Sequence, residues 1–248
     1  MVAKRLVAGV LMAGAAAVAV AAVALAPAGA SSHASASADT GASASTLYKE
    51  AVATTHGWSV HYASNSTSSN QTLVESGDAG PASASQTVTM GKGTISILVI
   101  GGFTYVKGNA TGLQNLAGLS SAQAIEAAGQ WIEFATDNTA FAPVVQGVRS
   151  SDIAKELAIK APLSLGHPRT LDGQAVDAIE GTQTFGRTSR HVVLYVRARG
   201  THVPVEEDSV NAEGKPSSDE HIAYSKWGER IRPQAPKATI SIGSISAV

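Results

Sequence analysis

The sequence predicts an α+β domain in which a curved antiparallel β-sheet packs against helices on one face. Three observations predict this fold class. The 248-residue chain is poor in aromatic (5%) and charged (15%) residues, whereas Ala, Ser, Gly, Thr and Val, which suit strands and turns, are abundant. Short runs of alternating apolar and polar residues fill two regions, separated by a helical middle. Strands that are grouped, and do not alternate with helices, are typical of α+β folds.

The first 30 residues have the features of a secretory targeting segment. Lys4 and Arg5 precede an uncharged run from Leu6 to Ala26, and Ala28-Gly29-Ala30 offers the small residues that a signal peptidase needs. Cleavage after Ala30 is the simplest interpretation. The run is also long enough to cross a bilayer, so an uncleaved membrane anchor is the alternative. With either N-terminus, the sequence predicts a secreted or extracytoplasmic protein. If the segment is not cleaved, the protein is expected to be tethered to the cytoplasmic membrane.

The rest of the chain divides into three parts. Residues 31–45 form a Ser/Ala-rich tract without periodicity, which is expected to be a disordered linker. Residues 46–236 are expected to form a single domain, because a chain of this length can bury one sizeable core. Residues 237–248 are expected to be a C-terminal tail.

The elements of the domain follow from local patterns. Leu47, Ala51 and Val52 recur at helical spacing, and Gly57 stops the helix predicted over 46–56. An antiparallel meander follows, with turns at Gly, Asn and Pro. Its expected strands are 58–63, 71–76, 86–90, 94–100 and 103–107.

The middle of the chain is more helical. Ser120 and Gln123 have capping-box spacing at the start of a helix predicted over 119–128. A second helical stretch covers 141–157 and is expected to break near Gly147. Strands then return in a second meander. Its expected strands are 163–165, 175–184, 189–198, 203–206 and 221–225.

Several stretches of the chain resemble actinobacterial envelope proteins of the LppX/LprG type. In the C-terminal half these are Thr170-Leu171-Asp172-Gly173, Leu194-Tyr195-Val196 with Val203-Pro204-Val205, and Tyr224 to Glu229 with Pro233 and Pro236. In the N-terminal half they are Phe103 to Asn109 and Trp131-Ile132. The family is similar in fold to the LolA/LolB lipoprotein carriers. The resemblance implies a half-barrel sheet that encloses an apolar cavity able to hold acyl chains.

One departure from that family concerns anchoring. Better-known members carry a lipidated cysteine after the signal, whereas this chain has no cysteine at all. A free secreted form or a membrane-tethered form is therefore expected in place of a lipoprotein. The same absence excludes disulfides, thiolate metal sites and cysteine nucleophiles.

Composition and motifs exclude several classes of function. The formal net charge of −1 does not favour a nucleic-acid partner, which normally needs a basic surface. The seven histidines have no metal-binding spacing, and no segment has the Gly-x-Ser-x-Gly pattern of an α/β-hydrolase. Phosphate-loop and dinucleotide-binding patterns are also missing. We therefore expect no enzyme activity, no catalytic residue, no metal and no cofactor.

Charged residues cluster in the second meander. Glu206, Glu207 and Asp208 form an acidic run near Glu213, Asp219 and Glu220, which we interpret as the solvated end of a hairpin. Arg187, Arg190, Arg197 and Arg199 are expected to pair with these acids across the sheet. The alternative is that the arginines contact a lipid phosphate.

The remaining candidates for function are apolar. Large side chains on one sheet face, opposite helices rich in small residues, either close a core or line a cavity for an acyl chain. The pocket candidates are Trp58, Ile97, Phe103, Tyr105, Trp131, Phe134, Val145, Leu163 and Ile179. The first hypothesis is a monomeric, non-enzymatic envelope protein that binds or carries a lipid or glycolipid, with contact to a membrane or an envelope protein. The alternative is an interaction or sensor module with a filled core and no ligand.

Overall fold

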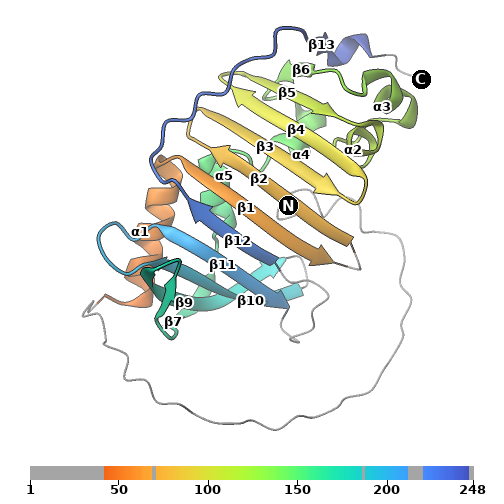
Figure 1. Ribbon diagram of the computed structural model, residues 1–248. Helices are drawn as coiled ribbons and strands as arrows, with labels where there is room; N and C mark the ends of the chain where they lie inside the picture. The colour runs from red at the N-terminus through yellow and green to blue at the C-terminus, as the bar shows by residue number, and fades with distance from the viewer. Residues whose placement is uncertain (1–41, 69–70, 186–187, 212–219, 246–248) are drawn as a thin grey trace, which may run out of the picture.

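A computed structural model describes residues 42–68, 71–185, 188–211 and 220–245. Across these ranges the chain forms one curved sheet of 13 strands, with the helices on one face (Figure 1). The strand order is β13-β6-β5-β4-β3-β2-β1-β12-β11-β10-β9-β7, and β8 pairs with β9. All pairings are antiparallel except the parallel pair of β13 and β6. The predicted fold class, a curved antiparallel sheet packed against helices, is confirmed.

The strands are β1 (Val60–Ser68), β2 (Gln71–Ala79), β3 (Ser83–Met90), β4 (Gly93–Ile100), β5 (Phe103–Gly108), β6 (Ile132–Ala135), β7 (Lys160–Leu165), β8 (Arg169–Leu171), β9 (Gln174–Phe185), β10 (Thr188–Arg197), β11 (Pro204–Asn211), β12 (Glu220–Ser225) and β13 (Ile240–Ser241). The helices are α1 (Ala44–Gly57), α2 (Ala110–Asn115), α3 (Ser121–Ala127), η2 (Thr139–Phe141), α4 (Ala142–Val145), α5 (Ser150–Glu156) and η4 (Ile242–Ser244).

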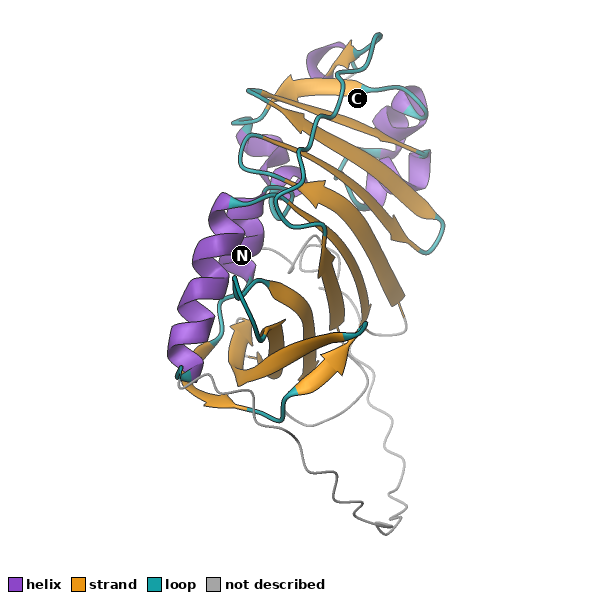
Figure 2. Ribbon diagram, turned by 60° about the vertical axis from the view of Figure 1, so that its left-hand side comes forward, coloured by secondary structure: helices purple, strands orange, loops and turns teal. Residues whose placement is uncertain are grey.

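The concave face of the sheet carries two separate apolar clusters. The first lies on β3 to β6, under α2, α3 and α4, and includes Ile95, Ile97 and Val99. The second lies on β1, β12, β10 and β9, under α1 and α5, and includes Leu47 and Ile179. Figure 2 shows α1 against the strongly curved end of the sheet that β9 and β10 form. Each cluster is therefore a small core between one group of helices and one half of the sheet.

Helix α2 sits unusually close to β4. The Asn109 side chain caps the helix, its Oδ1 accepting from the Gly112 N–H at 2.7 Å and from the Thr94 N–H of β4 at 3.2 Å. A Cβ at Gly112 would lie 2.3 Å from the Thr94 carbonyl oxygen. The first cluster thus depends on a glycine that lets helix and strand backbones touch.

The C-terminal strap, defined as residues 226–239, runs along one rim of the sheet (Figure 1). The Gly228 N–H donates to the Ser59 carbonyl at 2.9 Å, and Ser83 Oγ donates to the Ile231 carbonyl at 3.4 Å. Beyond the strap, β13 pairs with β6, and Ile245 is buried in the first cluster. The packed chain therefore continues past residue 236, where the sequence suggested a tail.

At the other end, α1 begins at Ala44 with Ser43 as its N-cap, inside the tract expected to be a linker. The targeting segment predicted over 1–30 lies outside the described residues, so its cleavage stays a prediction. Among the residues that the structure describes, no helix is long and apolar enough to span a bilayer.

The Tyr48 hydroxyl holds α1 to the chain between α5 and β7. It donates to the Leu157 carbonyl at 3.0 Å and accepts from the Ile159 N–H at 3.0 Å. Burial raises the pKa of Tyr48, since desolvation disfavours the phenolate. We expect Tyr48→Phe to lower the free energy of unfolding by about 2 kcal/mol, because two backbone groups lose a partner. Chemical denaturation measures this, and an unchanged midpoint would show that water replaces the hydroxyl.

Candidate functional site

A band of buried polar side chains lies on the concave face beside the two apolar clusters. Side chains alternate between the faces of a strand, so the registers of β1 to β3 and β10 to β12 place these residues on the same face as the clusters. Every one of them is less than 9% exposed. We call this band the concave polar belt; it consists of Ser64, Glu75, Gln86, Glu207, Ser209 and Glu220.

Gln86 lies at the centre of β3, between Gly77 of β2 and Ile97 of β4 in the strand register. Its side chain is only 3% exposed. Within the described part of the chain, neither its amide nitrogen nor its amide oxygen has a hydrogen-bond partner. A buried amide in this state costs about 1–3 kcal/mol. Gln86 can therefore donate to and accept from a bound molecule at no loss of internal bonds.

Gly77 of β2 lies close beside Gln86. A Cβ at Gly77 would lie 2.2 Å from the Ser85 carbonyl oxygen, 3.0 Å from the Tyr62 hydroxyl and 3.1 Å from the Gln86 Cα, so the position requires glycine. Ser209 of β11 is a second buried polar group, and among the described residues its hydroxyl has no hydrogen-bond partner. The belt thus offers both donor and acceptor groups to a ligand.

Carboxylates dominate the rest of the belt. Ser64 donates to Glu75 Oε2 at 3.2 Å, and Arg190 of β10 lies 3.4 Å from Glu220 Oε2. This ion pair confirms part of the expected cross-sheet pairing between arginines and acids. Arg187 lies outside the described residues. Buried carboxylates accept hydrogen bonds well, and they make the belt more suitable for hydroxyl groups than for phosphates.

The nine pocket candidates do not meet at one place. Ile97, Phe134 and Val145 pack together in the first cluster, whereas Ile179 and Leu163 belong to the second. Tyr105 and Trp131 lie on the convex face, because Val106 and Ile132, the residues that follow them, face the first cluster. Trp58 and Phe103 are 43% and 51% exposed. The role of these residues in ligand binding stays a prediction.

Sequence reasoning missed the belt. The belt has one signal in the sequence, a polar residue at a strand position where the alternation predicts an apolar one. Glu75 stands two residues after Leu73, and Gln86 stands midway between Ala84 and Val88. A strand with one buried face should be apolar at all of these positions. A buried polar group that interrupts such a pattern is the informative exception.

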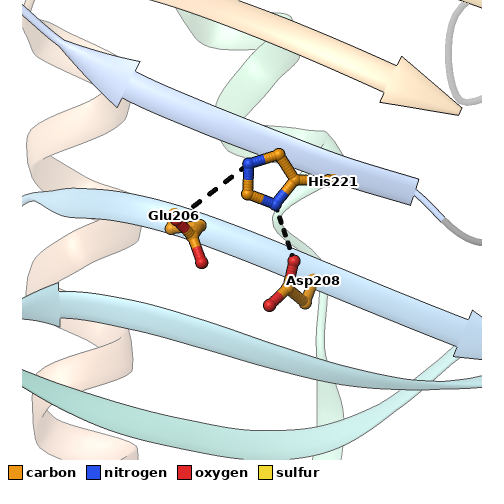
Figure 3. A group of neighbouring side chains, drawn as sticks. All are labelled: Glu206, Asp208 and His221. Atoms are coloured by element: carbon orange, nitrogen blue, oxygen red, sulfur yellow. Dashed lines mark hydrogen bonds and ion pairs between the residues drawn. The ribbon is translucent and has the colours of Figure 1, made fainter. Parts of the chain in front are cut away.

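The acidic run was wrongly interpreted as the end of a hairpin. Residues 206–208 lie in the middle of β11 and alternate, so Glu207 is buried on the concave face while Glu206 and Asp208 lie on the convex face. Figure 3 shows the convex pair with His221 of β12. His221 Nδ1 is 2.8 Å from Asp208, and Nε2 is 4.0 Å from Glu206 Oε2.

This convex group has the composition of a metal site. Its ligand atoms lie within 4.8 Å of one another, and carboxylates with imidazole suit several divalent ions. Cross-strand pairing explains this group without a metal ion. Elsewhere on the convex face His61 contacts Asp78 at 2.9 Å across β1 and β2, so cross-strand pairing of histidine with carboxylate recurs on this sheet. The geometry in Figure 3 needs no ion.

Burial raises the pKa of Glu206, and Asp208 raises it further, while His221 and Arg169 oppose the shift. A carboxyl whose pKa is higher when folded contributes stability below its unfolded pKa, and that contribution is lost as pH rises through the folded value. Glu206→Gln should therefore raise the free energy of unfolding at pH 7 by a fraction of a kcal/mol. The gain should vanish below about pH 4, where Glu206 is protonated in both states. Denaturation at both pH values measures this; a gain that is independent of pH would contradict it.

A groove lies at the rim, under the C-terminal strap. It has a volume of about 760 Å³ and is lined by Trp58, Trp227, Pro81 and Ile231, with Arg230 and Glu229 beside them. The Trp227 indole N–H donates to the Pro204 carbonyl at 2.8 Å, which fixes its ring. This groove opens at the rim of the sheet and is separate from the concave polar belt.

No protein-family model matches this chain, and no curated protein sequence matches it significantly. Among solved structures, LprF from Mycobacterium bovis superposes with a TM-score of 0.51 at 12% identity, over 78% of this chain and 96% of LprF. This chain shares the fold of LprF.

Two further structures are similar at lower TM-scores. A chain of the MucA/MucB complex from Pseudomonas aeruginosa gives 0.39 at 13% identity, over 83% of this chain and 61% of that one. A putative outer membrane lipoprotein-sorting protein domain from Vibrio parahaemolyticus gives 0.26 at 8% identity, over 79% of this chain and 94% of that domain. The comparison with LprF confirms the fold of the LppX/LprG type that the sequence suggested.

Proposed function

We propose that this protein is a non-enzymatic, extracytoplasmic binding protein for an amphipathic lipid or glycolipid. The ligand lies on the concave face, with its polar part at the concave polar belt and its acyl chains against the apolar clusters. One observation carries the proposal: the Gln86 side chain is 3% exposed and, among the described residues, has no hydrogen-bond partner for either amide atom. Buried polar groups in native proteins are nearly always satisfied, so one that is not points to a missing molecule.

The surroundings of Gln86 support a ligand with two chemical parts. Ile97, on the neighbouring strand, belongs to an apolar cluster that can contact hydrocarbon, and each buried methylene contributes roughly 0.8 kcal/mol. Ser64, Glu75 and Ser209 supply hydroxyl and carboxylate groups for the polar part. The fold shared with LprF agrees with this proposal, and so does the resemblance to LppX/LprG-type envelope proteins.

The competing function is an interaction module of the cell envelope that binds another protein and holds no ligand. The proposed lipid-binding function includes export from an actinobacterium and action as a monomer. The exposed groove at Trp58 is compatible with either function. The two functions predict different hydrogen-bond partners for the Gln86 amide. In an interaction module with a closed core the partner would be ordered water, whereas in a lipid-binding protein it would be the ligand.

Native mass spectrometry of the exported protein tests the proposal, combined with organic extraction of any molecule that co-purifies. A stoichiometric lipid supports the carrier function and identifies its ligand. If the protein is recovered without a ligand and takes up none from a panel of neutral, glycosylated and anionic lipids, the interaction module becomes the better account.

A further inference from the structure

The C-terminal strap forms a basic segment of the described surface. Residues 226–239 contain four cationic side chains, Lys226, Arg230, Arg232 and Lys237, and one anionic side chain, Glu229. All five are exposed. The complete chain has a net charge of −1, so this positive charge is local to the rim. A surface of one sign attracts partners of the opposite sign.

Exposed aromatic side chains lie along the same rim. Trp58 precedes β1 and is 43% exposed, with its ring over Gly228 of the strap. Phe103 begins β5 and is 51% exposed. In the strand register Phe103 pairs with Ile100, and Ile100 pairs with Ser83, which the strap contacts. Since strands are about 4.8 Å apart, the two rings are separated by roughly 20 Å along one edge of the sheet.

The combination of basic and aromatic groups identifies the partner chemistry. Trp side chains favour the interface between water and lipid, where the ring is partly apolar and the N–H stays hydrated. Lys and Arg close to such rings are attracted to anionic head groups, at about 1 kcal/mol per side chain. An acidic protein would use the cations but would not require aromatic rings spread along one edge.

We propose that the rim formed by the C-terminal strap, Trp58 and Phe103 docks on an anionic phospholipid surface. The strap is held to the ends of β1 and β3 by Ser59 and Ser83, so its cations are presented on a fixed edge. Docking at this edge leaves the concave face unobstructed. The docking site is distinct from the concave polar belt. The docking proposal therefore holds whether or not the belt binds a lipid.

Vesicle co-sedimentation tests this proposal on the exported protein, with the N-terminus of every variant shown to be the same by mass spectrometry. Vesicles of phosphatidylcholine mixed with phosphatidylglycerol are compared with pure phosphatidylcholine. We expect binding to the anionic vesicles only, and weaker binding at high salt because the charges are screened. Arg230→Ala with Arg232→Ala should weaken binding about 30-fold, following the loss of two cations. Trp58→Ser should weaken it several-fold at any salt concentration.

A matched control removes two cations elsewhere. Lys92 lies in the β3–β4 turn and Lys160 in β7, and both are exposed, so Lys92→Ala with Lys160→Ala should leave binding within about twofold of the parent. Circular dichroism confirms that each variant is folded. Equal weakening by both double variants would overturn the proposal, since it would show binding through net charge alone. Absence of binding to either vesicle would overturn it as well, and would favour an acidic protein as the partner of the strap.

Discussion

Replacing Gly112 by alanine is expected to lower the free energy of unfolding by about 3 kcal/mol. The new Cβ would lie 2.3 Å from the carbonyl oxygen of Thr94 and 2.7 Å from its nitrogen. These atoms belong to the backbone of β4, which cannot move without disturbing its pairing with β3 and β5. Helix α2 must therefore shift away from the sheet, and the contacts of Leu113 in the first cluster are weakened.

Chemical denaturation of the purified protein measures this effect, with Gly102→Ala as the matched control. A Cβ at Gly102 would meet no atom within 4 Å, so this substitution should change stability by less than about 0.5 kcal/mol. If Gly112→Ala were equally harmless, α2 would not pack on β4 as closely as we describe.

Replacing Gln86 by leucine is expected to have the opposite effect on the ligand-free protein, a gain of about 1–3 kcal/mol in the free energy of unfolding. Leucine has a similar volume and no polar atom, so the cost of the buried amide disappears. Ile97 on the neighbouring strand provides an apolar contact for the new side chain. A substitution that stabilises a protein at a buried polar position is typical of a site kept for function.

Gln183→Leu is the matched control for this prediction. Gln183 is also buried, and its amide oxygen has no partner among the described residues, but its amide nitrogen donates to the Glu156 carbonyl at 2.6 Å. Loss of this hydrogen bond in Gln183→Leu should lower the free energy of unfolding by about 1 kcal/mol or more. Thermal denaturation of delipidated protein compares the two variants. If both substitutions destabilise, Gln86 has an internal or water partner, and the argument for a ligand at the belt fails.

Much of the fold could be predicted because strands and helices leave local signals. The capping box of Ser120 and Gln123 is present as predicted, and the alternation over 94–100 gave β4 nearly to its ends. The turn at Asp172-Gly173 has the positive φ angles, 47° and 78°, that this residue pair favours. The strands β1 and β11 extend further than predicted, because the later residues of β1 are polar and were assigned to a turn, and the acidic run in β11 was interpreted as a hairpin end.

The site was less predictable, because its residues become neighbours only through the sheet register. Tyr62, Gly77 and Gln86 lie side by side across β1, β2 and β3, although each looks unremarkable in its own segment. Strand alternation indicates that Glu75 faces a core, but not which side chains surround it. The convex position of Tyr105 and Trp131 could not be predicted for a similar reason, because aromatic residues can pack on either face of a sheet.

Ligand occupancy in matched variants tests the central claim most directly. Native mass spectrometry would be carried out on the exported parent protein, Gln86→Leu and Gln183→Leu, prepared side by side. We predict that the parent and Gln183→Leu carry a lipid in similar amounts, whereas Gln86→Leu carries at least about tenfold less, since the polar part of the ligand loses its contacts at the belt. Equal occupancy in Gln86→Leu and the parent would contradict our account, because the ligand would then bind away from the concave polar belt.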